Sequence, residues 1–368
     1  MQPVDVPLFK VFMPETVGEE LTKTIHGGFI AEGKKVQEFG SKISGYIGNP
    51  RVVLTNSCTM ALTIAYRLSG VVPGTEVIST PLTCIASNIP ILQLGATPVW
   101  ADVDPETGMI DPEEVETLIN EKTRAILVLH KEGDPARMAE LIDIGRRHSV
   151  KIIEDAAHSF GSKYKGTKIG SHGDFVAFSF QAIKHITTGD GGALLCKDEE
   201  HYLSARKMKW FGVDRESRKS SHVWEQDIPD WGYKGNMNDI AATIGIEQMK
   251  HLDVIVDKFN SNGLRYSEFL KNVPGIKLIK RDPEDYSTFW AYCLLAENKN
   301  NLQEKLLSEG IDNRQIHYRN DEYSIFASSK RDLPNVDSFS QKELCIPCGW
   351  WVDEEIQNRI CSIIKSGW

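Results

Sequence analysis

The chain alternates short apolar segments with amphipathic ones over most of its length. Val36, Phe39, Ile43 and Ile47 recur at helical spacing, which predicts a helix over 35–47. Buried strands are predicted for five apolar segments, at 51–56, 76–80, 97–103, 124–130 and 151–157. Helices are predicted between and after them, at 57–70, from about 87, at 112–121 and at 136–149. This β-α-β-α order predicts a largely parallel sheet covered by helices, with ligands beyond the carboxyl ends of its strands.

The pattern changes in the second half of the chain. Two further strands, expected to be neighbours, are predicted at 175–181 and 191–196, and a long loop at 214–236. After a helix at 237–252 the pattern becomes α+β, with strands at 275–281 and 288–297 and a helix at 302–310. We therefore expect two parts, a large α/β domain over 1–252 and a smaller C-terminal α+β domain over 253–368.

Composition and charge narrow the function classes. The 368 residues carry a formal net charge of -9, which argues against nonspecific nucleic-acid binding and offers no basic membrane patch. No apolar run approaches the roughly 20 residues that span a bilayer, and the N-terminus does not resemble a secretory signal. The seven cysteines are scattered, and the CxxC pair Cys345 and Cys348 has no second pair to complete a zinc site. We expect a cytoplasmic protein with reduced cysteines and no metal.

Three segments at predicted strand ends carry candidate chemistry. The first, TNSCTMAL at 55–62, leads from a strand into a helix through small and hydroxyl residues. A helix N-terminus presents unpaired N–H groups and the positive end of its dipole, which suits a phosphate. Ser57 or Thr59 could equally be an ordinary helix N-cap.

The second segment, KIIEDAAHSFG at 151–161, places Glu154 and Asp155 at the mouth of an apolar strand. Successive strand residues point to opposite faces, so the two acids cannot share one role. One of them could hold a cationic ring nitrogen, or the pair could only cap a following helix.

The third segment, DFVAFSFQAIKHITTGDGGALL at 174–195, holds a lysine after an apolar strand and before a glycine-rich turn. Apolar neighbours would desolvate the Lys184 amine, lower its pKa and make it nucleophilic enough to form an imine. A lysine for an aldehyde, an acid for a ring nitrogen and an anion cradle together match the needs of pyridoxal phosphate.

Four segments in this order resemble the DegT/DnrJ/EryC1/StrS family of sugar aminotransferases: NSCTMAL, EDAAHSFG, FSFQAIKHITTGDGG and GYKGNMNDIAATIGIEQ. The resemblance covers nearly the whole chain. It implies the aspartate-aminotransferase-like fold of pyridoxal-phosphate enzymes (fold type I), and a homodimer in which each active site is completed by the neighbouring subunit.

By position, the resemblance implies that Lys184 is the Schiff-base lysine and that Asp155 faces the pyridine nitrogen of the cofactor. His158 occupies the position near the ring hydroxyl, which is often Gln in relatives. Ser179, with the backbone at Thr59 and Met60, would hold the phosphate.

The chain departs from the family pattern at several positions. Cys84 stands where an aromatic residue usually stacks on the cofactor ring, and Cys58 replaces a glycine of the phosphate turn. Lys234 replaces the asparagine that reaches the phosphate from the partner subunit, and a lysine could serve there as a point charge. The segment 130–132, His-Lys-Glu, replaces a more aromatic or glycine-bearing one, which indicates an unusual substrate side.

The implied reaction transfers an amino group from an amino acid, by family habit L-glutamate, to a keto sugar. A nucleotide-linked keto-deoxysugar for surface polysaccharide is the expected acceptor, and a keto sugar acid is the alternative. Candidate substrate contacts are His317, Arg319 and Asp321, with the undecided cations Lys131, Arg215, Arg218 and Lys219. Two other readings stay open. Sugar dehydratases of this fold carry histidine at the lysine position, and Lys184 is followed by His185. A noncatalytic scaffold could also keep the fold.

Overall fold

The computed structural model describes residues 4–215 and 227–368. Its centre is a seven-stranded sheet in the order β1-β9-β8-β5-β4-β2-β3. The strands from β8 to β3 in this order pair in parallel, whereas β9 is antiparallel to both β8 and β1. The predicted mainly parallel sheet is confirmed, and so is the predicted pairing of β8 with β9. The strands are β1 (Val52–Thr55), β2 (Glu76–Ser79), β3 (Thr97–Trp100), β4 (Thr123–Leu129), β5 (Lys151–Asp155), β8 (Phe175–Ser179) and β9 (Gly192–Cys196).

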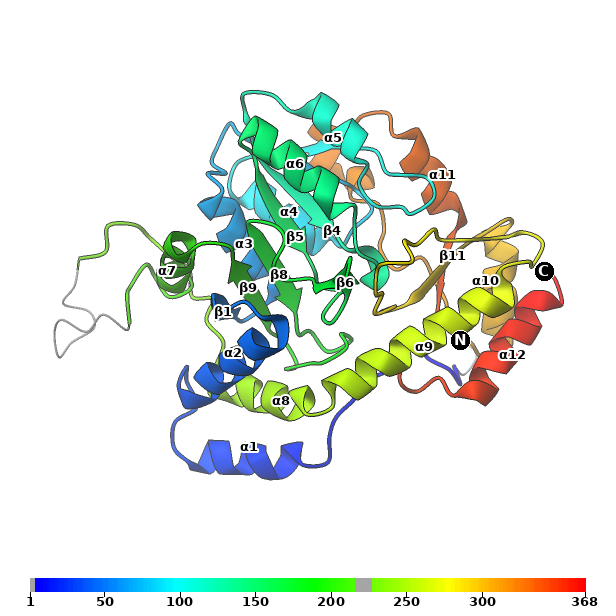
Figure 1. Cartoon of the computed structure of the whole chain (residues 1–368), viewed down its shortest axis with the longest axis horizontal. Helices are drawn as coiled ribbons and strands as arrows, with labels where there is room; N and C mark the ends of the chain where they lie inside the picture. The colour runs from blue at the N-terminus through cyan, green and yellow to red at the C-terminus, as the bar shows by residue number, and fades with distance from the viewer. Residues whose placement is uncertain (1–3, 216–226) are drawn as a thin grey trace.

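Helices cover both faces of this sheet because alternate strand residues are apolar on both sides. On one face Leu54, Phe178 and Leu195 pack against Phe39 and Ile246 of α2 and α8. On the other face the core contains residues of α3 and the neighbouring strand residues, among them Val53, Ala177 and Leu194. Figure 1 shows these layers. The helices of this region are α1 (Val17–His26), α2 (Lys34–Ile47), α3 (Cys58–Leu68), α4 (Ile85–Gln93), α5 (Pro112–Leu118), α6 (Met138–His148), α7 (Glu199–Met208) and α8 (Asp239–Met249).

A second, smaller sheet follows in the chain, with the antiparallel order β10-β11-β12. Its strands are β10 (Ile276–Leu278), β11 (Tyr292–Ala296) and β12 (Glu343–Ile346), and its helices are α10 (Lys299–Ser308), α11 (Pro334–Lys342) and α12 (Glu354–Lys365). The long helix α9 (Leu252–Leu270) runs from the large sheet toward this part (Figure 1). The domain boundary predicted from the sequence, between residues 252 and 253, falls at the start of α9. The N-terminal residue Val6 pairs with Ile311 and packs in the smaller core.

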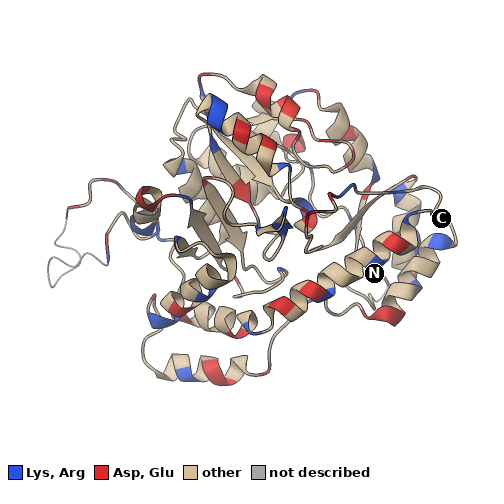
Figure 2. Cartoon of the chain, viewed as in Figure 1, with Lys and Arg blue, Asp and Glu red and all other residues tan. Residues whose placement is uncertain are grey.

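Short elements complete the described chain. They are the hairpin strands β6 (Lys163–Tyr164) and β7 (Thr167–Lys168) and the 3-10 helices η1 (Lys131–Gly133), η3 (Asn320–Glu322) and η4 (Ser324–Ser329). Of the loop predicted at 214–236, residues 216–226 lie outside the described residues. Acidic and basic residues alternate along the outer helices in the view of Figure 2. Within residues 4–215 and 227–368, no helix combines the length and apolarity needed to cross a membrane.

Candidate active site

The carboxyl ends of several central strands meet where the sequence placed its candidate chemistry. Thr55 at the end of β1 pairs with Gly192, and Gly192 pairs with Ser179 at the end of β8. Asp155 ends β5, which neighbours β8. Parallel strands bring these ends to one edge of the sheet, so residues far apart in sequence share one site.

The turn before α3 is built by a close backbone approach. Ser57 is the N-cap of α3, and its Oγ accepts a hydrogen bond from the Met60 N–H over 3.1 Å. A Cβ at Gly192 would lie 2.5 Å from Cys58 N and 2.6 Å from Ser57 O, so only glycine allows β9 to pass this close. The N-cap reading of Ser57 is confirmed, and the Met60 N–H already has a partner. Thr59 lies in the first turn of α3, whose N-terminal end faces this edge.

Asp155 and Glu154 point to opposite faces of β5, as their alternation predicts. Asp155 is buried, and its carboxylate accepts hydrogen bonds from Ser87 Oγ at 2.6 Å and from the Ala157 N–H at 3.1 Å. Burial raises the pKa of Asp155, while these two donors favour its ionised form. Glu154 instead binds His130 Nε2 at 2.8 Å inside the protein. Of the two acids, Asp155 therefore stands beside the other candidate groups.

Lys184 lies in the turn between β8 and β9, and its backbone N–H donates to Gln181 O over 3.0 Å. Burial lowers the pKa of its amine to about 8, although the nearby Asp155 charge favours the ammonium form. In the described part of the chain the Lys184 Nζ makes no hydrogen bond or ion pair. It lies 3.7 Å from the centroid of the Trp290 ring. Such an amine is uncharged often enough at neutral pH to act as a nucleophile or base.

Two parallel imidazoles line the same site. The rings of His158 and His317 are 5.4 Å apart at an interplanar angle of 7°. Burial lowers the pKa of both well below the ordinary value, and the nearby Lys184 charge acts in the same direction. Among the described residues, His158 Nδ1 and His317 Nε2 are buried without a hydrogen-bond partner. Buried polar atoms are normally satisfied, so these nitrogens fit a polar group that is bound during function.

Pyridoxal phosphate fits this set of residues. Lys184 has an amine, Asp155 a buried carboxylate and His158 an unpaired ring nitrogen. Ser179 ends β8 at the edge that the start of α3 faces, where a phosphate would have to be held. The thiols Cys58 and Cys84 act electrostatically on Lys184, which places them near the same amine. Burial raises the pKa of the Cys58 thiol well above its usual range, and the Asp155 charge adds to this effect. The Cys58 thiol is therefore a neutral neighbour of the site. Cys84 precedes α4 as its N-cap residue.

The unusual segment after β4 forms a buried charge cluster. Lys131 Nζ donates to Glu132 Oε1 at 3.0 Å and to Glu343 Oε1 at 2.6 Å, and all three side chains are buried. Burial raises the pKa of Glu132 to about 7. Cys293, Glu343 and Cys345 also gather their possible ligand atoms within 4.8 Å. Because Lys131 binds Glu343 there, the cluster already contains its cation.

The remaining candidates fall into four cases. Arg319 binds Asp321 at 2.6 Å and also pairs with Asp337, so these two candidate substrate residues are engaged with each other. Lys234 is exposed and donates to Asn236 Oδ1 at 2.5 Å. Arg215 pairs with Glu32 at 2.8 Å. Arg218 and Lys219 lie outside the described residues.

The structure shows which of the two neighbours, Lys184 or His185, lies in the site. His185 is buried, with its Nε2 3.0 Å from Thr288 O and its ring against Phe259. Lys184 rather than His185 lies with Asp155, Cys58 and Cys84. Ser87 and Trp290 also contact the site residues Asp155 and Lys184, but neither stands in a recognisable motif and their partners are remote in sequence.

Comparisons with known proteins agree with this geometry. The sequence model of the DegT/DnrJ/EryC1/StrS aminotransferase family matches residues 13–365. The chain is 31% identical over 351 residues to the spore coat polysaccharide biosynthesis protein SpsC of Bacillus subtilis, covering 89% of this chain and 88% of SpsC. It is 31% identical over 341 residues to the UDP-4-amino-4,6-dideoxy-N-acetyl-beta-L-altrosamine transaminase of Campylobacter jejuni, covering 90% of this chain and 89% of the transaminase.

Solved structures show the same fold over the whole chain. The sugar aminotransferase CalS13 of Micromonospora echinospora superposes with a TM-score of 0.95 at 32% identity, covering 99% of this chain and 100% of CalS13. The PLP-form of Spr1654 from Streptococcus pneumoniae superposes with a TM-score of 0.90 at 26% identity, covering 98% of each chain. The expected fold type I is confirmed. With Lys184 in the turn after β8 and the buried Asp155 at the end of β5, the chain belongs to the DegT/DnrJ/EryC1/StrS family and is a pyridoxal-phosphate-dependent aminotransferase.

Proposed function

We propose that the chain transfers an amino group from L-glutamate to a nucleotide-linked keto-deoxysugar used in surface polysaccharide synthesis. The observation that carries the chemistry is the buried amine of Lys184, whose pKa burial lowers to about 8, beside Asp155. The acceptor class is inferred from relatives: one is named for spore coat polysaccharide biosynthesis and another as a UDP-sugar transaminase. The amino donor follows the family habit.

In the proposed site, each residue has one task. Lys184 would bind the cofactor aldehyde, Asp155 would face its ring nitrogen, and His158 would bind its ring hydroxyl. Ser179 and the start of α3, at the backbone of Thr59 and Met60, would bind its phosphate, with the Met60 N–H exchanging its present partner, Ser57 Oγ, for a phosphate oxygen. When bound, the cofactor supplies an electron sink for the negative charge that develops on the reacting carbon.

The protein's own chemistry is proton transfer. After the donor displaces it, Lys184 Nζ takes a proton from the α-carbon of the amino donor. In the second half of the reaction the same atom delivers a proton to the sugar carbon that receives the amino group. A single amine can do both because its pKa, lowered by burial to about 8, lies near neutral pH. Asp155, buried and hydrogen-bonded, keeps the ring nitrogen protonated throughout.

The internal ion pairs bear on the choice of acceptor. A keto sugar acid would need a cation free to bind its carboxylate. Lys131 is held between Glu132 and Glu343, and Arg319 is held by Asp321 and Asp337. These two candidates are therefore engaged within the protein and are not offered to a carboxylate. The choice of a nucleotide-linked acceptor rests on the relatives, because the diphosphate of such a sugar is also an anion. His317, with its unpaired Nε2 near Lys184, is the substrate contact that we retain.

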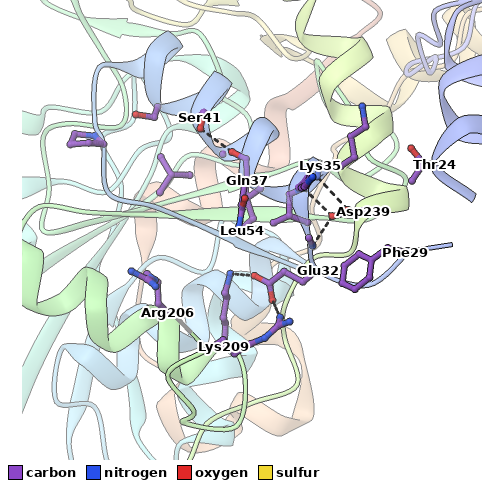
Figure 3. A pocket seen from close by; sticks show the side chains of 18 of the residues that line it. Thr24, Phe29, Glu32, Lys35, Gln37, Ser41, Leu54, Arg206, Lys209 and Asp239 are labelled. Atoms are coloured by element: carbon purple, nitrogen blue, oxygen red, sulfur yellow. Dashed lines mark hydrogen bonds and ion pairs between the residues drawn. The ribbon is translucent and has the colours of Figure 1, made fainter. Parts of the chain in front are cut away.

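A homodimer with shared sites is part of the proposal. A cavity of about 1140 Å³ lies along the edge strand β1 and is lined by residues of α1, α2 and α7. Figure 3 shows Glu32 in this cavity bound to Lys209, with Asp239 beside Lys35. Phe29 in the cavity wall and Trp231 near α3 are 55% and 58% exposed. Large exposed apolar side chains beside a cavity suit a subunit interface.

Lys234 suits a role across that interface. It is exposed, and the role across the interface follows from the family resemblance of its position. Within its own chain the adjoining Gly235 O accepts a hydrogen bond from the Asn56 N–H over 2.7 Å, so a role in the same subunit is the alternative that the test must separate. Mixing two impaired variants tests the shared site. Lys184→Ala and Lys234→Ala chains each lack one required lysine, but a mixed dimer would contain one site with both. Regained activity on mixing is expected, and its absence would contradict sharing through Lys234.

The reaction itself is tested on the purified full chain by absorption spectroscopy. We expect the band of the lysine-linked cofactor to bleach on adding L-glutamate and to return with a suitable keto sugar. Lys184→Ala should lack the lysine-linked band. Lys168→Ala is the matched control, since burial also lowers the pKa of Lys168 but its Nζ binds Tyr46 O at 2.6 Å. A wild-type chain that binds no cofactor would refute the proposal and revive the scaffold reading.

A further inference from the structure

One buried tryptophan contacts Lys184 in two ways. The Lys184 Nζ lies 3.7 Å from the centroid of the Trp290 ring, and Trp290 Nε1 donates a hydrogen bond to Ile183 O over 2.8 Å. Trp290 itself is only 1% exposed, whereas its two partners Ile183 and Lys184 are half-buried. It belongs to the segment before β11, whereas Lys184 follows β8, so the second sheet reaches the lysine through this side chain.

The indole is itself held by other rings. His158 stacks on Trp290 with ring centroids 3.9 Å apart and an interplanar angle of 14°. Phe9, from the N-terminal segment, stacks on it at 4.5 Å and 22°. A ring packed in this way cannot turn aside to make room for a moving side chain, so its position relative to Lys184 is fixed.

We propose that Trp290 is a positioning residue for Lys184: its ring receives the ammonium form of the amine, and its N–H fixes the adjoining backbone. This inference rests on the proposed function. Lys184 alternates between binding the cofactor and carrying a proton as a free amine. In the free state, the Nζ has no hydrogen-bond partner among the described residues, and the electron-rich indole face is the group in contact with it that attracts its charge.

Other titratable groups also act on this amine and come from every element packed around it. Those that favour its charged form are Asp155, Cys58, Cys84 and Glu132. Those that are themselves affected by its charge are His158, His185 and His317. All of them are retained when Trp290 alone is changed, but His158 and His317 stack on the replaced ring. The shift is therefore assigned to the ring only when Trp290→Phe, which keeps a ring for these histidines, gives an intermediate value.

The test measures the pKa of the free Lys184 amine in the full chain. The enzyme is loaded with cofactor and treated with L-glutamate, which frees the lysine. A lysine-acylating reagent is then applied from about pH 6 to about pH 10, which brackets the expected titration. The rate of labelling is followed by mass spectrometry on the peptide that contains Lys184.

We expect Trp290→Leu to lower the pKa of Lys184 by about half a unit to one and a half units, because an apolar group without a π face replaces the ring. Trp290→Phe keeps a weaker ring and should fall between wild type and Trp290→Leu. If Trp290→Leu does not fold, Trp290→Phe alone still tests the proposal, because the pKa of Lys184 should be lower in this variant than in the wild type. An unchanged pKa would overturn the proposal, and so would a raised one, since it would mean that the ring only excludes water.

Trp368→Leu is the matched control. The Trp368 indole also donates to a backbone carbonyl, Glu297 O at 2.7 Å, but it belongs to the C-terminal end of the chain. An equal shift in this variant would overturn the assignment to Trp290. The measurement also separates the two proposals. A wild-type chain that takes up no cofactor refutes the proposed function, yet the labelling of Lys184 can still be compared among the variants.

Discussion

Ser87 donates its hydroxyl hydrogen to Asp155 Oδ2 across 2.6 Å, and Thr83 Oγ1 lies 2.8 Å from the same hydroxyl. The site carboxylate is thus oriented by the first turn of α4. Burial raises the pKa of Asp155, and the Ser87 hydrogen bond opposes that rise. α4, the helix that follows Cys84, therefore contributes to the site indirectly, because its Ser87 orients Asp155.

Ser87→Ala should weaken cofactor binding and slow the donor half-reaction. Loss of a hydrogen bond to a charged group costs about 1.5–3 kcal/mol, which corresponds to roughly tenfold to a hundredfold in affinity. Cofactor titration by absorbance measures it. Ser69→Ala is the control, because Ser69 is also buried and donates instead to Ala65 O at 2.8 Å. Equal losses in both variants would show that Ser87 has no special role.

The rate of the donor half-reaction should depend on pH through the titration of the Lys184 amine. Its pKa, lowered by burial to about 8, means that the amine gains its base form as pH rises toward that value. Only the uncharged amine can accept a proton, so the donor half-reaction should quicken about tenfold per pH unit below about pH 8 and then level off. Single-turnover absorbance measurements give this profile.

Glu132 could add a second transition, because burial raises its pKa to about 7. Glu132→Gln removes that titration while keeping the side-chain shape. A rise that still levels near pH 8 in Glu132→Gln assigns the main transition to Lys184. If the transition disappears in this variant, the assignment to Lys184 is wrong.

Lys131→Met should destabilise the protein strongly. Lys131 is the cation between Glu132 and Glu343, and its removal leaves two buried acids without a partner. Breaking a buried pair in this way costs about 3–5 kcal/mol. Denaturant unfolding measures the loss. Lys23→Met, at an exposed pair with Glu19, should leave the midpoint nearly unchanged. Adding Glu343→Gln to Lys131→Met should recover part of the stability, and no recovery would argue against the ion pair as the cause.

The sequence predicted those site features that follow from local rules. Strand alternation separates Glu154 from Asp155, and the structure places them with His130 and Ser87 respectively. The strand-to-turn position of Lys184 likewise follows from the apolar strand before it. These inferences need only the period of a strand and the edge at which parallel strands end.

The remaining features depend on contacts that no local pattern encodes. Trp290 lies in a predicted strand segment, and nothing in that segment indicates that its ring reaches Lys184. For Arg319 and Asp321 the charges were visible, but whether they face a substrate or each other depends on the fold of 318–337. Long-range packing, rather than residue type, decides these cases.

Gly192→Ala should disrupt the phosphate cradle without touching a polar side chain. The new Cβ would lie 2.5 Å from Cys58 N, and backbone cannot move aside as a flexible side chain can. The start of α3 must shift, at a cost of about 1–3 kcal/mol, and cofactor affinity should fall roughly tenfold to a hundredfold. Gly18→Ala is the control, because no heavy atom lies within 4 Å of a Cβ at Gly18 in α1. Titration with free pyridoxal phosphate measures both variants. Unaltered affinity in Gly192→Ala would show that the turn at Ser57 and Cys58 does not hold the phosphate.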